Sequence, residues 1–183
     1  YEEILIDDVN NVSSLHETTV RLIKQLVKDY QIDENRIYAT GQSGGCMTAI
    51  ALNIKYPNLF AGSFLVAGQY NPELVQPMTN AKLWIMVSAD DTKAFPGQNA
   101  ITEKLQSFGV KIRRGFWDAR WDKNMYQFAY DQITEEHAQV YYTVFAPGSV
   151  LIDGPDHGAG HRNTWRFAYT IEPIRQWLFQ QHK

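Results

Sequence analysis

The stretch YATGQSGGCMTAIAL, residues 38–52, joins the end of a short β-rich run to an apolar, helix-like run through a glycine-rich turn. Gly41, Gly44 and Gly45 surround Ser43 in that turn. Glycine is used where the backbone must turn sharply or approach another group closely. We therefore predict a strand, a tight turn and a helix, with the turn presenting the hydroxyl group of Ser43.

Residues 41–45 fit the pattern G-x-S-x-G, which in a strand–turn–helix setting is typical of a nucleophile elbow. In such an elbow larger neighbours are expected to collide, and the backbone N–H of Gly44 is expected to donate to a developing oxyanion. Two other readings stay open: a plain strand-to-helix turn and an anion-binding turn. A Walker-type phosphate loop is disfavoured because no Gly-Lys-Ser/Thr sequence follows.

The composition of the chain narrows the class of protein. The 183 residues carry a net charge of −3, which gives no electrostatic basis for binding nucleic acid. No apolar run approaches the ~18 residues of a membrane span. The single cysteine, Cys46, excludes an internal disulfide, and its apolar surroundings indicate a buried small side chain.

Strand-like and helix-like runs alternate along the chain. We expect strands at 36–40, 59–68, 82–89 and 139–145, and helices at 14–30, 45–56, 99–109, 122–136 and from 163, the last restarting at Pro173. Such alternation predicts the α/β class, with a mostly parallel sheet and helices on both faces.

A serine nucleophile needs a base, and the base needs an acid that orients it. The strand at 82–89 ends directly in Asp90 and Asp91, where a parallel sheet gathers its functional loops. We predict that Asp91 is the acid, because it lies three residues after the small residue Ser88. An aspartate here can also simply cap the next helix, and the roles of the two aspartates can be exchanged.

The base is expected in the glycine-rich loop DGPDHGAGHRNTW, residues 153–165, after the last strand. His161 is favoured, and His157 is predicted to line the site. Asp153 or Asp156 can pair with either histidine. The same side chains offer a His-x-x-x-His metal pattern, but that spacing suits zinc only on a helix, which the neighbouring glycines disfavour. We therefore predict no metal and no cofactor.

Three segments carry a resemblance to a known family: DENRIYATGQSGGCMTAIAL (33–52), KLWIMVSADDTKAF (82–95) and HRNTWRFAYTIEPIRQWLFQQ (161–181). Together they resemble the α/β-hydrolase superfamily, in its esterase and polyhydroxybutyrate-depolymerase-like, or predicted-peptidase, branch. The resemblance implies a serine hydrolase without metal that uses Ser43, Asp91 and His161. It also favours an extracytoplasmic or secreted location.

The N-terminal part of the chain departs from this family. Only a short segment precedes the first predicted helix, and it contains no His-Gly or Gly-Gly run to supply a second oxyanion donor. We expect residues 1–183 to form a single α/β-hydrolase-like domain that lacks its first strands. An exposed sheet edge is then expected to associate with a missing N-terminal segment or with another chain.

Residues 109–132 form the least expected segment, with Trp117 and Trp121 flanking Asp118 and Arg120. One interpretation is an amphipathic helix packed on the core. The other is a substrate lid, in which Trp117 and Trp121 join Gln42 in binding a sugar or aromatic acid.

The leading functional hypothesis is hydrolysis of a small-molecule or polymer ester through an acyl-enzyme on Ser43. A peptidase with the same triad is a close alternative. A non-catalytic fragment or interaction module that needs the missing segment is another, because the front of the hydrolase scaffold is absent.

Overall fold

The computed structural model of the protein describes residues 14–152 and 158–183, and places five parallel strands in one sheet. The strand order is β1-β2-β3-β5-β4, and every neighbouring pair is parallel. The strands are β1 (Tyr38–Gln42), β2 (Gly62–Val66), β3 (Leu83–Ser88), β4 (Ile112–Trp117) and β5 (Val140–Phe145). His157, Asp153 and Asp156 lie outside the described residues.

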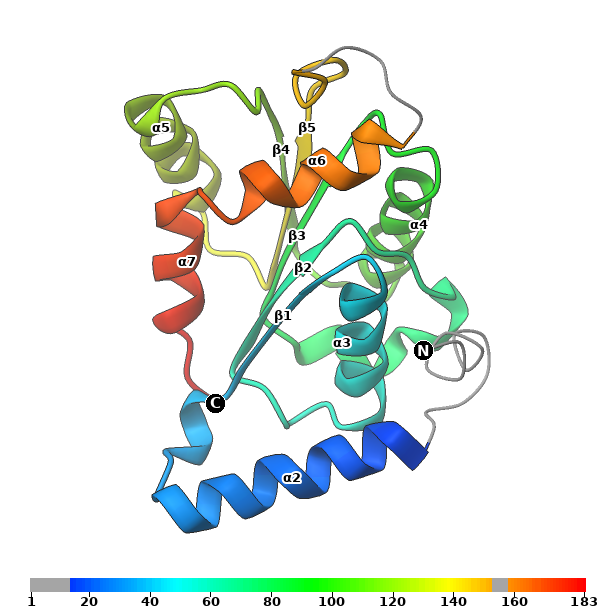
Figure 1. Cartoon of the computed structure of the whole chain (residues 1–183), viewed down its shortest axis with the longest axis vertical. Coiled ribbons are helices and arrows are strands. Elements are labelled where there is room, and N and C mark those ends of the chain that lie inside the picture. The colour runs from blue at the N-terminus through cyan, green and yellow to red at the C-terminus, as the bar shows by residue number, and fades with distance from the viewer. Residues whose placement is uncertain (1–13, 153–157) are drawn as a thin grey trace.

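Helices cover both faces of the sheet, as the alternation of elements predicted (Figure 1). In Figure 1, α3 and α4 lie on one side of the strands, and α5 and α7 lie on the other. The α-helices are α2 (Ser14–Tyr30), α3 (Gly44–Lys55), α4 (Ala94–Ser107), α5 (Lys123–Thr134), α6 (Ala159–Ala168) and α7 (Glu172–Phe179). Short 3-10 helices span Glu34–Arg36, Pro72–Leu74 and Gln76–Asn80. The α/β class is therefore confirmed. No helix within the described ranges has the length and apolar character needed to span a bilayer.

The three central strands are buried along their whole length because helices cover both of their faces. Trp84 of β3 lies at the centre of this core, with its ring stacked on Tyr141 and edge-on to Trp177. Its indole N–H donates to the hydroxyl of Thr143 at 3.0 Å, so that this buried polar group is satisfied. The core thus fixes β3 against β5, the two strands that precede the predicted acid and base.

The structure corrects the interpretation of residues 109–132 as one helix or a lid. Residues 112–117 form the edge strand β4, whose Gly115 pairs with Thr143 of β5. The run KIRRGFW has neither helical nor alternating spacing, and the exposed edge of β5 provides the hydrogen bonds that make it a strand. The helix begins only at Lys123, where the Asp122 side chain accepts from two backbone N–H groups.

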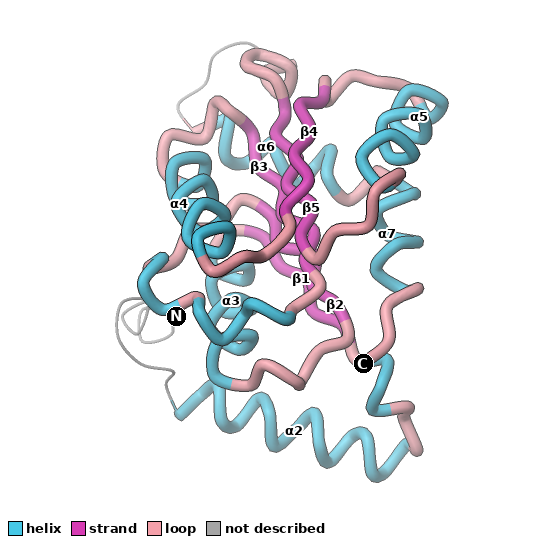
Figure 2. The backbone as a smooth tube through the Cα atoms, turned by 180° about the vertical axis from the view of Figure 1, so that it is seen from behind, coloured by secondary structure: helices cyan, strands magenta, loops and turns pink. Residues whose placement is uncertain are grey.

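β1 and β4 are the two outer strands of the sheet, because the strand order places β2, β3 and β5 between them. Figure 2 shows the sheet from behind, again with α3 and α4 on one side and α5 and α7 on the other. The C-terminal tail lies against the beginning of β1. There the hydroxyl of Tyr38 bonds to the carbonyl oxygens of Phe179 and Gln181, at 3.0 Å each. The other end of β1 leads directly into the turn that contains Ser43.

Candidate active site

Ser43 is the single residue between β1 and α3, and its backbone has φ 51° and ψ −122°. Few non-glycine residues adopt a positive φ, and such strain gathers at functional sites. The turn is held by the backbone N–H of Ser43, which donates to the carbonyl of Val66 at 3.1 Å. The carbonyl of Ser43 accepts from the N–H of Met47 at 3.1 Å as α3 begins. The hydroxyl-bearing residue is thus fixed in the strained position that a nucleophile elbow requires.

The glycines around Ser43 have different roles. A Cβ atom on Gly41 would lie 2.4 Å from the backbone carbon of Gly45, so the turn admits only glycine at position 41. A Cβ atom on Gly45 would meet nothing within 4 Å. The expectation that larger neighbours collide therefore holds for Gly41 and is wrong for Gly45 in this chain.

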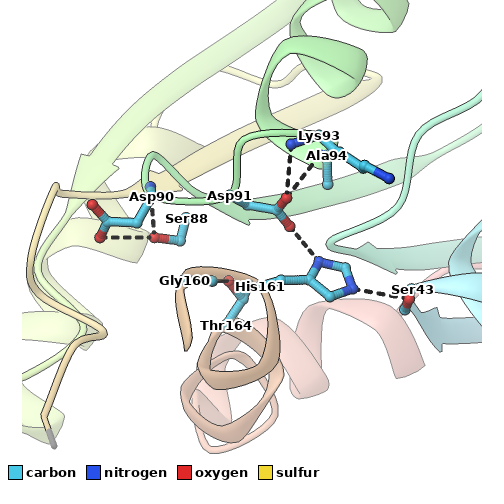
Figure 3. A network of polar contacts seen from close by, with 9 residues as sticks. All are labelled: Ser43, Ser88, Asp90, Asp91, Lys93, Ala94, Gly160, His161 and Thr164. Atoms are coloured by element: carbon cyan, nitrogen blue, oxygen red, sulfur yellow. Dashed lines mark hydrogen bonds and ion pairs between the residues drawn. The ribbon is translucent and has the colours of Figure 1, made fainter. Parts of the chain in front are cut away.

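A hydrogen-bonded chain links Ser43, His161 and Asp91 (Figure 3). Nε2 of His161 lies 2.9 Å from Oγ of Ser43, and Nδ1 lies 2.5 Å from Oδ2 of Asp91. Ser43, Asp91 and His161 lie in the segments that follow β1, β3 and β5, at the carboxyl edge of the sheet, with His161 on α6. With Nδ1 protonated, Nε2 is free to accept the proton of the serine hydroxyl.

The two carboxylate oxygens of Asp91 make different contacts. Oδ2 faces His161, and Oδ1 accepts from the backbone N–H groups of Lys93 at 3.1 Å and Ala94 at 2.9 Å. The same residue therefore makes the contacts expected of an aspartate that caps α4 and the contact expected of an acid that orients a histidine. Burial acts to raise the pKa of Asp91, but the hydrogen bond from His161 and the two amide N–H groups outweigh it, and the pKa is lowered.

Asp90, the alternative acid, points away from His161 (Figure 3). Its Oδ2 atom accepts from the backbone N–H of Gly148 at 2.8 Å, in the loop after β5. The backbone N–H of Asp90 donates to Oγ of Ser88 at 3.1 Å. Asp90 therefore ties the loop after β3 to the loop after β5, and Asp91 is the aspartate in contact with the imidazole.

His161 is the third residue of α6, not part of a loop as the sequence indicated. The start of α6 packs so closely on the loop after β3 that a Cβ atom on Gly160 would lie 2.4 Å from the carbonyl oxygen of Asp90. The Asn163 side chain donates to the carbonyl of Val150 at 2.9 Å. Close packing and this hydrogen bond together position His161 relative to Asp91.

A cavity of about 550 Å³ opens beside the three residues. Besides Ser43 and His161 its walls include Met47, Gln69 and Lys93. Gly44, the predicted oxyanion donor, is the first residue of α3, where backbone N–H groups have no partner within the helix. The cavity therefore exposes Ser43 and His161 together, next to the residue at which α3 begins.

Three of the predicted substrate-binding residues, Gln42, Trp117 and Trp121, do not line this cavity. Gln42 is exposed, and its Oε1 atom accepts from the hydroxyl of Tyr169 at 3.2 Å. Trp117 is only 3% exposed, and with Trp121 it borders a separate cavity of about 690 Å³ between β4 and α5. His157 lies outside the described residues. Gln42, Trp117 and Trp121 are therefore not among the residues that line the cavity beside Ser43.

The sequence marks Trp165 only as part of the segment 161–181 that resembles the hydrolase family, and it does not predict the contact of Trp165 with His161. The two rings are nearly perpendicular, with centroids 5.1 Å apart and an angle of 87° between their planes. The contact could not be predicted because the sequence did not indicate that His161 lies on a helix. Once His161 is placed on a helix, the four-residue spacing brings Trp165 to the same face.

The metal alternative stays untested, because three of its four candidate ligands lie outside the described residues. Within residues 14–152 and 158–183, no three His, Cys, Asp or Glu side chains are grouped to hold an ion.

Comparisons with known proteins agree with the fold. Residues 16–106 match the sequence model of the prolyl oligopeptidase family. A solved structure described as a thermostable esterase superposes with a TM-score of 0.71 and 23% sequence identity, covering 94% of this chain and 38% of that one. No curated protein matches by sequence. The chain thus spans less than half the length of the esterase.

The parallel sheet, the strained serine turn and these similarities define an α/β-hydrolase fold with esterase-like and peptidase-like relatives. At the level of reaction class, they support a serine hydrolase of the α/β-hydrolase type.

Proposed function

We propose that this chain carries the catalytic centre of a carboxylic-ester hydrolase, with Ser43 as nucleophile, His161 as base and Asp91 as the acid that orients the base. The observation that carries the proposal is the continuous hydrogen-bonded chain from Oγ of Ser43 to Oδ2 of Asp91, starting at a positive-φ serine. A serine in an ordinary turn needs neither the strained backbone nor the paired histidine.

The geometry supports a two-step reaction. Nε2 of His161 takes the hydroxyl proton as Oγ of Ser43 bonds to the ester carbonyl carbon, and the N–H of Gly44 donates to the resulting oxyanion. The imidazolium then gives that proton to the departing alkoxide, which leaves as an alcohol. Water, deprotonated by the same Nε2, attacks the acyl-enzyme and releases the carboxylic acid. Asp91 stays ionised throughout and stabilises the imidazolium.

Ester and peptide substrates share this chemistry. Similarity to a thermostable esterase over 94% of the chain favours an ester, and the prolyl oligopeptidase match favours a peptide. We place the ester first because the esterase similarity covers 94% of the chain, whereas the family match ends at residue 106.

The proposal extends to a second polypeptide segment that pairs with the outer edge of β1. Within the described residues, β1 has a strand neighbour on one side only. An unpaired edge presents free N–H and C=O groups to another strand. We propose that this edge associates with an N-terminal segment or with another chain, and that the added segment supplies the second oxyanion donor.

Labelling with a fluorophosphonate probe, followed by mass-spectrometric mapping, tests the centre directly. We expect the adduct on Ser43, absent in Ser43→Ala and strongly reduced in His161→Ala. A panel of p-nitrophenyl esters and peptide anilides then separates ester from peptide hydrolysis. An unlabelled Ser43 in folded protein contradicts the catalytic proposal and favours the non-catalytic interaction module.

A further inference from the structure

The imidazole of His161 is held on two sides by hydrogen bonds and on a third by an aromatic ring. Asp91 and Ser43 bond its two nitrogens. Trp165, one helical turn later on α6, stands edge-to-face with it at 5.1 Å. Trp165 is itself partly buried and packs against the hydrophobic core. The Trp165 ring is therefore a fixed wall beside a side chain that is 31% exposed.

This packing matters because the two hydrogen bonds alone do not prevent the His161 side chain from adopting another rotamer. A histidine on the first turn of a helix can rotate about its side-chain torsions towards water, where both nitrogens find partners. Misplacing a catalytic group by about 1 Å can reduce the rate about a hundredfold. A perpendicular ring at van der Waals distance removes space for such rotation and excludes water from one side of the imidazole.

The charged groups around His161 do not hold the ring in this orientation. Asp90 and Lys93 line the same cavity, but neither makes a hydrogen bond to the imidazole. Arg162, the next residue on α6, is exposed and lies near Gly158. Among residues 14–152 and 158–183, Asp91 is the one charged side chain that bonds to the ring. Within this part of the chain, the contacts that restrict rotation of the ring come from Asp91, Ser43 and Trp165.

We propose that Trp165 is a positioning residue, which holds the His161 imidazole in the one rotamer that reaches both Asp91 and Ser43. The proposal rests on the proposed function for its kinetic consequence, but the position of the ring can be measured without any turnover.

The test compares three variants on the full 183-residue chain. Trp165→Leu removes the aromatic ring, and Trp165→Phe keeps a smaller aromatic ring at the same position. Phe167→Leu is the matched control: it lies two residues later on α6, also packs on the core, and pairs with Phe145 instead of His161. The rate constant of fluorophosphonate labelling measures the reactivity of Ser43. The low-field NMR resonance of the His161 Nδ1 proton measures the bond to Asp91, and thermal unfolding measures the loss of packing.

We expect Trp165→Leu to slow labelling by about tenfold or more and to weaken or broaden the low-field resonance. Trp165→Phe should stay within about threefold of the wild type. Phe167→Leu should lower the melting temperature to a similar degree as Trp165→Leu while keeping both the labelling rate and the resonance. With an ester substrate, the loss in Trp165→Leu should appear in kcat and not in KM.

Equal labelling rates and an unchanged resonance in Trp165→Leu would overturn the positioning role, as would the same losses in Phe167→Leu. If the wild type itself is not labelled, the proposed function fails. The NMR comparison of the same variants then still decides the role of Trp165.

Discussion

The Gly160→Ala variant tests the geometry of the site, because it keeps Ser43, His161 and Asp91 but should shift His161 relative to Asp91. The added Cβ atom would lie 2.4 Å from the carbonyl oxygen and 2.6 Å from the carbonyl carbon of Asp90. These are backbone atoms that cannot rotate away, so an ordinary contact of about 3.4 Å requires α6 to move by about 1 Å. A movement of that size away from the loop that carries Asp90 and Asp91 would lengthen the 2.5 Å contact between Nδ1 of His161 and Oδ2 of Asp91 to about 3.5 Å, beyond the usual range of a hydrogen bond.

We expect Gly160→Ala to lower the fluorophosphonate labelling rate and kcat by about a hundredfold, although Ser43, His161 and Asp91 are all retained. Stopped-flow labelling and ester hydrolysis measure the loss, and circular dichroism verifies the fold. Gly45→Ala is the glycine-to-alanine control for stability, because a Cβ atom there meets nothing within 4 Å. A Gly160→Ala protein that labels at the wild-type rate would refute the idea that close packing of α6 on Asp90 sets the position of His161.

Four further predictions follow from the same structure. Gly41→Ala should prevent folding or lower the free energy of unfolding by several kcal/mol, whereas Gly45→Ala should be neutral or stabilising by up to about 1 kcal/mol in urea unfolding. Because the folded-state pKa of Asp91 is lowered, its ionised form stabilises the fold above the unfolded pKa of about 3.9. The difference in unfolding free energy between wild type and Asp91→Asn should therefore be widest near pH 7 and shrink as pH falls below about 4. Burial raises the pKa of Cys46 to about 12, so Ellman's reagent should leave the native thiol unmodified at pH 8 and titrate it in urea. Ser43→Gly should abolish labelling yet equal or exceed Ser43→Ala in thermal stability, because glycine accepts the positive φ without strain.

The fold class and the positions of Ser43, Asp91 and His161 along the chain could be predicted from the sequence, because they depend on local patterns. The central strands are apolar along their whole length, which indicates strands buried on both faces. The spacing of small residues around Ser43 reflects a steric requirement that the structure shows at Gly41. Asp91 follows the end of a predicted strand, and the chain order of serine, acid and histidine restricted the base to one loop.

The features that the sequence did not predict depend on contacts between distant residues. β4 forms because the outer edge of β5 is available for pairing, and nothing within residues 112–117 encodes that partner. His161 was assigned to a loop because Gly158 and Gly160 weaken a helix. In the structure, Gly158 is the N-cap residue of α6 and has a φ of 85°, and Gly160 allows α6 to approach Asp90 closely. Both glycines therefore contribute to the helix, although their presence in the sequence predicts a loop.

The same topology connects the open edge of the sheet with the chemistry proposed for Ser43. Neighbouring strands of a parallel sheet bring the loops at their carboxyl ends together, as the loops after β1, β3 and β5 do here. A parallel strand added to the free edge of β1 would therefore place its own carboxyl-end loop beside Ser43, on the side away from β2. That position suits the second oxyanion donor, and loss of one such donor slows turnover by about 10²–10³-fold. The hydrogen-bonded chain of Ser43, His161 and Asp91 is present in this chain, and Gly44 offers one oxyanion donor, whereas the second donor would come from the added segment. Addition of that segment should therefore raise ester turnover without any change in the hydrogen bond between His161 and Asp91.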